Sequence, residues 1–381
     1  ASIPEFLHKP SREGARYLKM KKIQGKKDYI CDACTVSEMK ENINWKKREK
    51  ELEKLLNKHR SKKGNYDCIV PGSGGKDSVY ASHILKYKYG MNPLTVTWPP
   101  ILYTSYGYEN FKNWIEIGGF DNITFKQNGR VMKLLTKLSI QNLLHPFQTF
   151  ILGQKNIGPR LAAKYNIPLV FYGEAEAEYG NPVHELTAKR DTSYWLQKNL
   201  KKLFLAGIPI KRLIEDYKLS LGDLKPYLPL DEIEMKNKVE VHYLGYYKKW
   251  IPQESYYYSV EHSNFKARPF RTQGTYSKYS SIDDKIDDLH YYTTFIKFGI
   301  GRATYDASQE VRNKHLTRDE AIKLVSRYDG EFPDKYLEDV LDYLGLKKEE
   351  FSKLCDKFRS PHLWKKDQSG LWKLRKSVFN N

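Results

Sequence analysis

Between residues 66 and 173, short apolar runs alternate with stretches of helical spacing, and this alternation restricts the fold more than any other feature of the chain. The apolar runs are YDCIVP, NPLTVTW, NITF and IPLVFYG, and the intervening helical stretches include KDSVYASHILKYKYG, YENFKNWIEIGG and GRVMKLLTKLSIQNLL. Strands that alternate with helices of this length predict a parallel sheet with right-handed crossovers. We therefore predict an α/β fold with a Rossmann-like parallel sheet and flanking helices.

Further helices are predicted within this alternation and on both sides of it. Residues 42–60 have apolar side chains on one side and charges elsewhere, which indicates a helix. The stretch FILGQKNIGPRLAAKYN is helical in pattern, but we expect it to break near Gly158 and Pro159. From about residue 181 the strand signal fades, and the C-terminal part is predicted to be mostly helical. One of its helices begins with a capping box, Thr317 with Glu320.

The loop GSGGKDS follows the first predicted strand and opens the first helix, which is where doubly wound sheets bind ligands. Glycines permit a close backbone approach, a lysine adds positive charge, and a helix N-terminus attracts anions. The loop lacks the Walker A pattern, because Val70 and Asp77 occupy positions that need Gly and Ser or Thr. A carboxylate such as Asp77 would repel phosphate unless it caps the helix or holds Mg²⁺. The predicted phosphate-binding residues are Gly72, Ser73, Gly74, Gly75, Lys76, Asp77 and Ser78.

The segment SGGKDS after a buried strand resembles the signature of the PP-loop ATP pyrophosphatases. This resemblance implies that the loop grips the β,γ-pyrophosphate of ATP while a substrate oxygen attacks the α-phosphorus, with Mg²⁺ as a cofactor. It also implies catalytic roles for Lys76 and Asp77. Thr97, at the end of the second predicted strand, is a candidate for contact with the adenine, or else an ordinary packing residue.

Three segments outside the loop resemble the N-acetyl sugar amidotransferases, the WbpG/PseA group of bacterial surface-polysaccharide and nonulosonic (pseudaminic or legionaminic) acid pathways. They are CDAC followed by NINWKKREKEL, YGEAEAEYG, and FIKFGIGRATYDASQEVRNKHLTRDEAIKLVSRYDG, so the likeness runs from about Cys31 to Cys355. It implies an enzyme that adenylates the acetamido oxygen of an acidic or nucleotide-linked sugar. Ammonia then displaces AMP and leaves an acetamidino group.

Ammonia needs a source, and the chain shows no glutaminase nucleophile. Such a cysteine sits on a tight, glycine-flanked elbow, and none of the four cysteines has a glycine neighbour. The family resemblance implies a separate glutaminase partner related to the imidazole-glycerol-phosphate synthase pair.

Two further residues are predicted to be catalytic. Glu174 follows a predicted strand, where an acid binds Mg²⁺ or orients the amide and ammonia; the alternative is a solvated acidic loop. Arg302, in the GRAT segment, is suited to a phosphate or a sugar carboxylate; the alternative is a surface ion pair.

Cys31 and Cys34 form a C-x-x-C pair, which suggests zinc. Zinc prefers four ligands, and the upstream pair that family members carry is absent here. Cys68, Cys355 and His8 are the remaining candidates, although Cys68 falls in a predicted core strand. The alternative is a degenerate knuckle with free thiols.

These observations predict three parts: residues 1–60, an N-terminal segment with the partial knuckle and a helix; residues 61–180, the PP-loop core; and residues 181–381, a substrate-binding and helical region. The net charge is +19, but the basic residues are dispersed and often mixed with acids, so solvated lysines explain it better than nucleic acid. The runner-up function is a PP-loop tRNA-modifying enzyme of the thiolation or lysidine type, and a third is a non-catalytic nucleotide-binding partner. Few cysteines and the absence of a long apolar run predict a cytoplasmic protein without a membrane span.

Overall fold

The fold is built on one five-stranded parallel sheet, seen in a computed structural model that describes residues 20–22, 29–174, 196, 199, 203–235 and 238–378. Its strands are β3 (Cys68–Pro71), β4 (Pro93–Thr97), β5 (Asn122–Thr124), β6 (Leu169–Tyr172) and β9 (Glu240–Tyr243). The spatial order is β5-β4-β3-β6-β9, and every neighbouring pair is parallel. The predicted Rossmann-like α/β fold is confirmed. The order reverses between β3 and β6, and this reversal creates the crevice where such sheets bind ligands.

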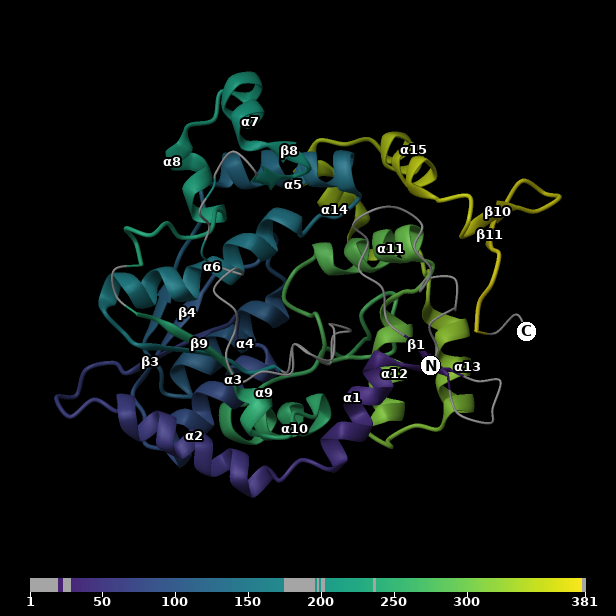
Figure 1. The fold of residues 1–381 in the computed structure, drawn as a ribbon. Helices are drawn as coiled ribbons and strands as arrows, with labels where there is room; N and C mark the ends of the chain where they lie inside the picture. The colour runs from purple at the N-terminus through teal and green to yellow at the C-terminus, as the bar shows by residue number, and fades with distance from the viewer. Residues whose placement is uncertain are drawn as a thin grey trace.

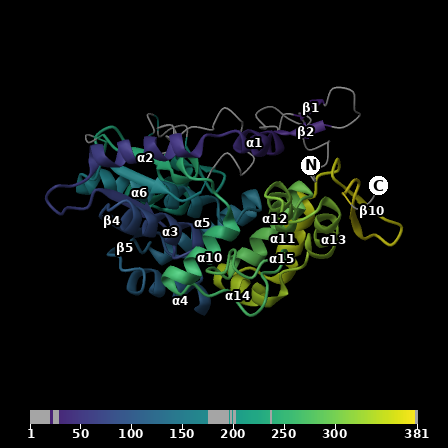
Figure 2. The ribbon, with the colours of Figure 1, turned by 90° about the horizontal axis from the view of Figure 1, so that it is seen from below.

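Helices cover both faces of the sheet because the side chains of its buried strands alternate between the faces. Ile69 of β3 belongs to a core with α5 (Gly129–Leu143) and α6 (Gln148–Tyr165). Its neighbours Cys68 and Val70 belong to the opposite core, with α2 (Trp45–His59) and α3 (Lys76–His83). Figures 1 and 2 show the two helical layers around the strands. The helix expected over residues 42–60 is α2, and Cys68 is the core-strand residue that was expected.

The helix α6 corrects the sequence analysis, because it continues through the predicted break. Pro159 lies inside it and has no N–H to offer to the carbonyl oxygen of Lys155, four residues earlier. The hydroxyl of Tyr172, at the end of β6, donates to that oxygen at 3.1 Å. Gly158 supports the same packing, since a Cβ there would approach the ring of Pro71 to 2.7 Å. The sheet thus supplies the hydrogen bond that proline removes.

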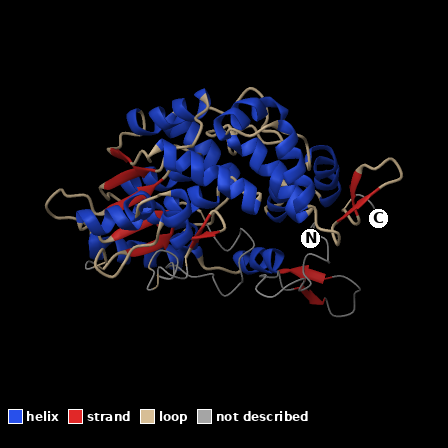
Figure 3. Ribbon diagram, turned by 90° about the horizontal axis from the view of Figure 1, so that it is seen from above, coloured by secondary structure: helices blue, strands red, loops and turns tan. Residues whose placement is uncertain are grey.

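The C-terminal part forms a second core beside the sheet layers. Its helices are α11 (Ile286–Phe298), α14 (Asp334–Leu344) and α15 (Lys348–Phe358), which pack on the C-terminal part of α5. The helices α12 (Arg302–Arg312) and α13 (Arg318–Tyr328) lie alongside, and the predicted capping box of Thr317 and Glu320 is present at the start of α13. Figure 2 shows α11, α12, α13 and α15 at the end of the molecule away from the main sheet, and Figure 3 shows the strands of that sheet at the opposite end from the chain termini. The mostly helical C-terminal part is therefore confirmed.

The remaining elements connect or flank these layers. They are β1 (Met20–Lys22), β2 (Tyr29–Cys31), α1 (Asp32–Glu41), the π-helix η2 (Ile84–Lys88), α4 (Ser105–Glu116), β7 (Phe204–Leu205), β8 (Ile208–Pro209), α7 (Ile210–Tyr217), α8 (Leu221–Leu224), the 3₁₀-helix η7 (Lys225–Tyr227), α9 (Leu244–Tyr247), α10 (Pro252–Ser263), β10 (Trp364–Lys366) and β11 (Trp372–Leu374). The sequence analysis predicted neither the β1–β2 pair nor β9. Among the described residues, no helix has the length and apolar character needed to cross a membrane.

Candidate active site

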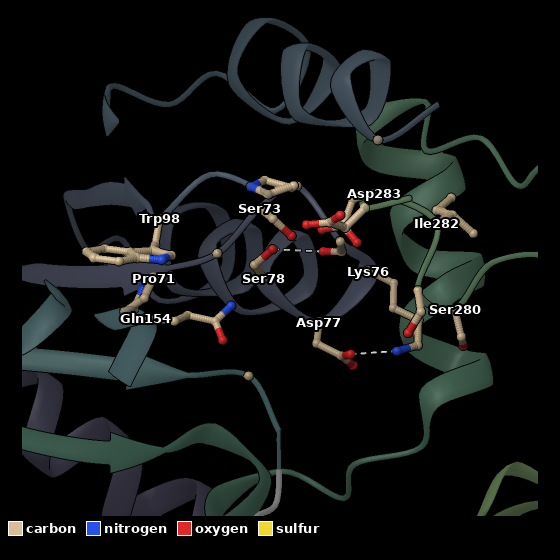
Figure 4. A pocket seen from close by; sticks show the side chains of 18 of the residues that line it. Pro71, Ser73, Lys76, Asp77, Ser78, Trp98, Gln154, Ser280, Ile282 and Asp283 are labelled. Atoms are coloured by element: carbon tan, nitrogen blue, oxygen red, sulfur yellow. Dashed lines mark hydrogen bonds and ion pairs between the residues drawn. The ribbon is translucent and has the colours of Figure 1, made fainter. Parts of the chain in front are cut away.

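A cavity of about 670 Å³ lies where β3, β4 and β6 end. Its wall is built from the loop at residues 71–78, the residues after β4 and β6, the inner side of α6, the segment at residues 279–284, and one residue each from α11 and α12. Figure 4 shows the loop facing Asp283 across this space. The sheet and the C-terminal helices therefore contribute to one site.

The shape of the loop depends on two of its glycines. The N–H of Gly72 donates to the carbonyl oxygen of Val96 at 2.9 Å, and a Cβ on Gly72 would lie 2.2 Å from the Cβ of Ser78. Gly74 has φ +85°, and a Cβ there would lie 2.6 Å from the Cα of Phe111. Larger residues cannot occupy either position without moving the backbone.

The loop ends at the N-terminus of α3, which is open to the cavity. The N-cap residue is Gly75, so no side chain caps the first N–H groups of the helix. A Cβ on Gly75 would meet only the hydroxyl of Ser73, at 3.8 Å, which leaves space for a ligand in front of the backbone. The hydroxyl of Ser78 donates back to the carbonyl oxygen of Gly75 at 2.8 Å. Uncapped N–H groups at a helix start attract an anion.

The carboxylate of Asp77 has partners that the sequence did not reveal. It lies 2.5 Å from the ammonium of Lys76, and the indole N–H of Trp250 donates to its other oxygen at 2.8 Å. Both charged side chains are mostly buried, at 13% and 15% exposure. Asp77 does not cap the helix, and its charge is compensated before any phosphate arrives.

Opposite the loop, the segment at residues 279–284 is fixed to the start of α4. Thr104 makes two of these bonds: its hydroxyl donates to the carbonyl oxygen of Ile282, and its N–H donates to that of Asp283 at 3.0 Å. The Asp284 carboxylate accepts a hydrogen bond from the N–H of Ile101 at 2.6 Å. The Ser73 side chain faces Asp283 across the cavity and opposes the rise that burial causes in the pKa of that carboxyl.

This wall is acidic, and the sequence analysis missed it. Asp283, Asp284 and Asp287 all line the cavity. Burial raises the pKa of Asp283, and it raises the pKa of Asp284 to about 7. The pattern IDDKIDD lies across the start of α11, which begins only at Ile286. A sequence signal for this wall does exist, because the acids directly follow Ile282 and Ile286. Both isoleucines are buried, and they place the adjoining acids near the interior of the protein.

The structure brings the two other predicted catalytic residues into the same cavity. Arg302 lines it while also pairing with Asp306 at 2.7 Å and lying 5.1 Å above the ring of Tyr291. The helix ion pair that was the alternative reading therefore exists, but it orients a guanidinium that faces the cavity. Glu174 lines the cavity just after β6, and its negative charge adds to the rise that burial causes in the pKa of Tyr305.

Two other groups of predicted residues lie elsewhere. Thr97 is fully buried in β4, accepts a hydrogen bond from the side-chain amide of Asn122 at 3.0 Å, and is not among the residues of the cavity wall. The next residue, Trp98, does line the cavity. A contact between Thr97 and the nucleotide thus stays a prediction that this placement does not favour.

The proposed zinc ligands are only partly described. Cys34 is half-buried in α1, and the side chain of Cys31 lies outside the described residues. Cys68 and Cys355 are buried in two separate cores, so they do not combine into one ligand set. The described residues contain no group of three His, Cys, Asp or Glu side chains that could hold a metal. Zinc at Cys31 and Cys34 stays a prediction.

Comparison with known proteins gives a family match in the C-terminal part and partial likenesses to other proteins. Residues 273–378 match the family model described as "LPS biosynthesis protein WbpG-like, C-terminal domain". An uncharacterized protein of Methanocaldococcus jannaschii is 43% identical over 67 residues, which are 18% of this chain and 24% of that protein. The match therefore spans about a quarter of that relative's length.

Two solved structures share a limited likeness with this chain. NMN synthetase from Francisella tularensis is 19% identical, with a TM-score of 0.26, over 36% of this chain and 57% of the other. The U34-tRNA thiolase NcsA from Methanococcus maripaludis, with its [4Fe-4S] cluster, is 15% identical, with a TM-score of 0.30, over 80% and 91%. Likeness at these scores is too weak to support conclusions about chemistry.

The family match includes Arg302 and the whole GRAT segment, on which the expected resemblance depended. The predicted resemblance to the WbpG-like group is confirmed there. Residues 273–378, which match the WbpG-like C-terminal domain model, close a cavity whose opposite wall is the SGGKDS loop of a parallel α/β sheet.

Proposed function

We propose that the protein is a cytoplasmic, ATP-dependent amidotransferase that converts the acetamido group of an acidic or nucleotide-linked N-acetyl sugar into an acetamidino group. AMP and pyrophosphate are the other products. The observation that carries this proposal is the single cavity shared by the SGGKDS loop and by Arg302 of the WbpG-like part. A pyrophosphate-binding loop and a second cation on the opposite wall suit a reaction with two anionic substrates.

The loop is suited to the departing pyrophosphate. The uncapped N–H groups of α3 and the ammonium of Lys76 provide donors and positive charge at one end of the cavity. Lys76 is held beside Asp77 in the free protein, so a phosphate would compete with a carboxylate for it. Asp77 keeps its bond from Trp250 in that event and stays in place.

The residues present also fit Mg²⁺, in the way this ion is commonly bound. It is typically held by one or two carboxylates together with substrate phosphates and water, rather than by a protein cage. Asp77 and Glu174 both line the cavity and would serve as such carboxylates. The ion would neutralise part of the phosphate charge.

The sugar would occupy the side of the cavity near Arg302. Its guanidinium is fixed by Asp306 and by the ring of Tyr291, so it is preorganised for a carboxylate or phosphate. The acetamido oxygen would then attack the α-phosphorus, and the bond to pyrophosphate would break. The resulting O-adenylyl imidate carries a good leaving group, AMP, which ammonia from a glutaminase partner displaces. Surface glycans and nonulosonic acids, such as pseudaminic and legionaminic acids, are the pathways we propose for this product.

A mass-resolved assay tests the proposal. The protein is incubated with ATP, Mg²⁺, ammonium and a panel of CMP- and UDP-linked acetamido sugars. Replacement of oxygen by NH lowers the sugar mass by about 1 Da, with one AMP per product, as the displacement chemistry requires. The proposal would be contradicted if no AMP formed with any sugar of the panel.

The net charge of +19 and the C-x-x-C pair of Cys31 and Cys34 are the observations that favour the alternative, a tRNA-modifying enzyme. The same assay with tRNA in place of sugar separates the two. tRNA-dependent AMP formation, with an RNA affinity that falls steeply with salt, would favour the alternative. Binding of ATP without AMP formation on any substrate would indicate a non-catalytic nucleotide-binding protein.

A further inference from the structure

Asp287 is a buried acid with one carboxylate oxygen that no described residue satisfies. It lies in the first turn of α11, is 9% exposed, and lines the cavity. Its Oδ2 atom is buried and has no hydrogen-bond partner among the described residues. A first-turn aspartate ordinarily uses its carboxylate to accept N–H bonds from the helix start, and this oxygen accepts none. A buried polar atom without a partner costs free energy, which a ligand in the cavity would offset.

The surroundings of Asp287 favour a guest that is basic or cationic. Asp283 and Asp284 line the same cavity, and burial followed by the charges of these two acids raises the pKa of Asp287 well above its usual range. Asp288 adds to the rise, and Arg302 opposes it. A raised pKa suits a group that accepts a proton during a reaction near neutral pH.

The position of Asp287 relates it to the reacting end of the cavity. Its neighbour in the wall, Asp283, faces Ser73 of the loop, and Arg302 lines the same cavity from α12. Thr104 fixes the wall to the start of α4, so the place of the wall is built into the fold. Asp287 thus stands in a space bordered by both anion-binding elements, where an acetamido group would meet the α-phosphate.

We propose that Asp287 is a catalytic residue that receives the nitrogen nucleophile: its free carboxylate oxygen accepts an N–H of ammonia and takes the proton that amidine formation releases. This inference rests on the proposed function. It assigns ammonia, a small cation-forming nucleophile, to the acidic wall, and the two anionic substrates to the loop and to Arg302.

The step balances in atoms and charge. The nitrogen of ammonia forms a bond to the imidate carbon, which leaves the nitrogen with one proton too many. That proton passes to the carboxylate of Asp287. The bond between the carbon and the oxygen of AMP then breaks, and its electron pair leaves with AMP. The products are an amidinium, AMP and a protonated Asp287, which releases its proton when the products depart.

Asp287→Asn tests the role, with Asp288→Asn as a matched control. Asp288 is the next residue and is also buried, at 3% exposure with an unpartnered Oδ2, but it does not line the cavity. Sugar-dependent exchange of labelled pyrophosphate into ATP, without ammonia, measures adenylation alone. Turnover with added ammonium measures both steps.

We expect Asp287→Asn to keep pyrophosphate exchange within a few-fold of wild type and to lose about 100-fold or more of ammonium-dependent turnover, the usual effect of removing a general base. We expect Asp288→Asn to keep both the pyrophosphate exchange and the ammonium-dependent turnover of wild type. Loss of exchange and turnover to the same extent in Asp287→Asn would overturn the inference, and so would wild-type turnover with ammonium. If wild type itself shows no sugar-dependent exchange, it is the proposed function that fails. A thermal melt of each variant reports whether it is folded.

Discussion

At the scale of single residues, the Lys76–Asp77 pair explains how a carboxylate can sit in a phosphate loop. The two side chains neutralise each other, and the indole of Trp250 holds Asp77 from outside the loop. A phosphate that enters therefore meets no net repulsion from the loop, and it competes with one carboxylate for the ammonium. The mostly buried setting makes this competition stronger than it would be in water.

The pair gives a prediction for the loop. Lys76→Ala removes the cation and should lower AMP formation by about 100-fold or more, as the loss of a preorganised donor does. Asp77→Asn should have a comparable effect. Trp250→Phe keeps the carboxylate and loses only its indole bond, so its loss should be smaller than that of Asp77→Asn. AMP release in the sugar assay measures the activity of all three variants. Near-normal turnover in Lys76→Ala would show that the loop has no part in the mechanism.

The residues of the site differ in how far the sequence predicts them. The loop, Glu174 and Arg302 lie in contiguous motifs, and all of them line the cavity. Asp283 and Asp287 were missed because their positions depend on hydrogen bonds between segments more than 170 residues apart in sequence, such as that of Thr104 with Ile282. Trp250 was missed for the same reason, since its bond to Asp77 also joins distant segments. Such contacts leave no local pattern.

At the scale of elements, the alternation of strands and helices predicted four of the five parallel strands. The fifth, β9, was missed because two of its four residues, Glu240 and His242, read as polar. In the fold, His242 is buried and its ring is bonded to the hydroxyl of Tyr247. The break predicted in α6 was wrong because the hydroxyl of Tyr172 takes over the bond that Pro159 cannot make. Tertiary partners thus overrode the local preference in both cases.

The α6 contact gives a prediction for stability. Tyr172→Phe removes the donor to the Lys155 carbonyl oxygen and should lower the free energy of unfolding by about 1 kcal/mol. In a Pro159→Ala background, the new N–H at position 159 can donate to the same oxygen, so Tyr172→Phe should cost less there. Denaturant unfolding of the four proteins in this cycle gives the coupling. An equal cost in both backgrounds would show that the hydroxyl does not substitute for the missing N–H.

At the scale of the whole molecule, two of the hydrophobic cores meet at α5. One end of this helix packs with the sheet, and the other packs with α11, α14 and α15. Two buried histidines, His145 and His290, stack at 4.9 Å in this second region. Burial lowers the pKa of His145 to about 4 and, together with the charge of His145, that of His290 to about 3.

These histidines give a prediction for the dependence of stability on pH. Their pKa values are lower in the folded state than in the unfolded chain, so the unfolded chain takes up protons first as the pH falls below about 6.5. Their protonation therefore favours unfolding in acid. The buried acids act in the opposite direction, because burial raises the pKa of Asp288 to about 6.

A variant separates the two contributions. In His290→Leu, the free energy of unfolding should decline less than that of wild type between about pH 7.5 and about pH 5, because one titrating group has been removed and the acids are unchanged. Denaturant unfolding at the two pH values measures the difference. Parallel declines in the two proteins would mean that His290 is not held neutral in the native state.

The approach of Ser73 to Asp283 across the cavity has a consequence for how this protein can be divided or rebuilt. It closes a ring that runs from the first strand of the sheet, through the phosphate loop, into the WbpG-like part and back along α4. Neither half of the chain contains a complete cavity wall. A recombinant of two relatives that exchanges only residues 273–378 would have to preserve Ser73, Thr104 and Asp283 together. We therefore expect these three positions to be inherited as a unit.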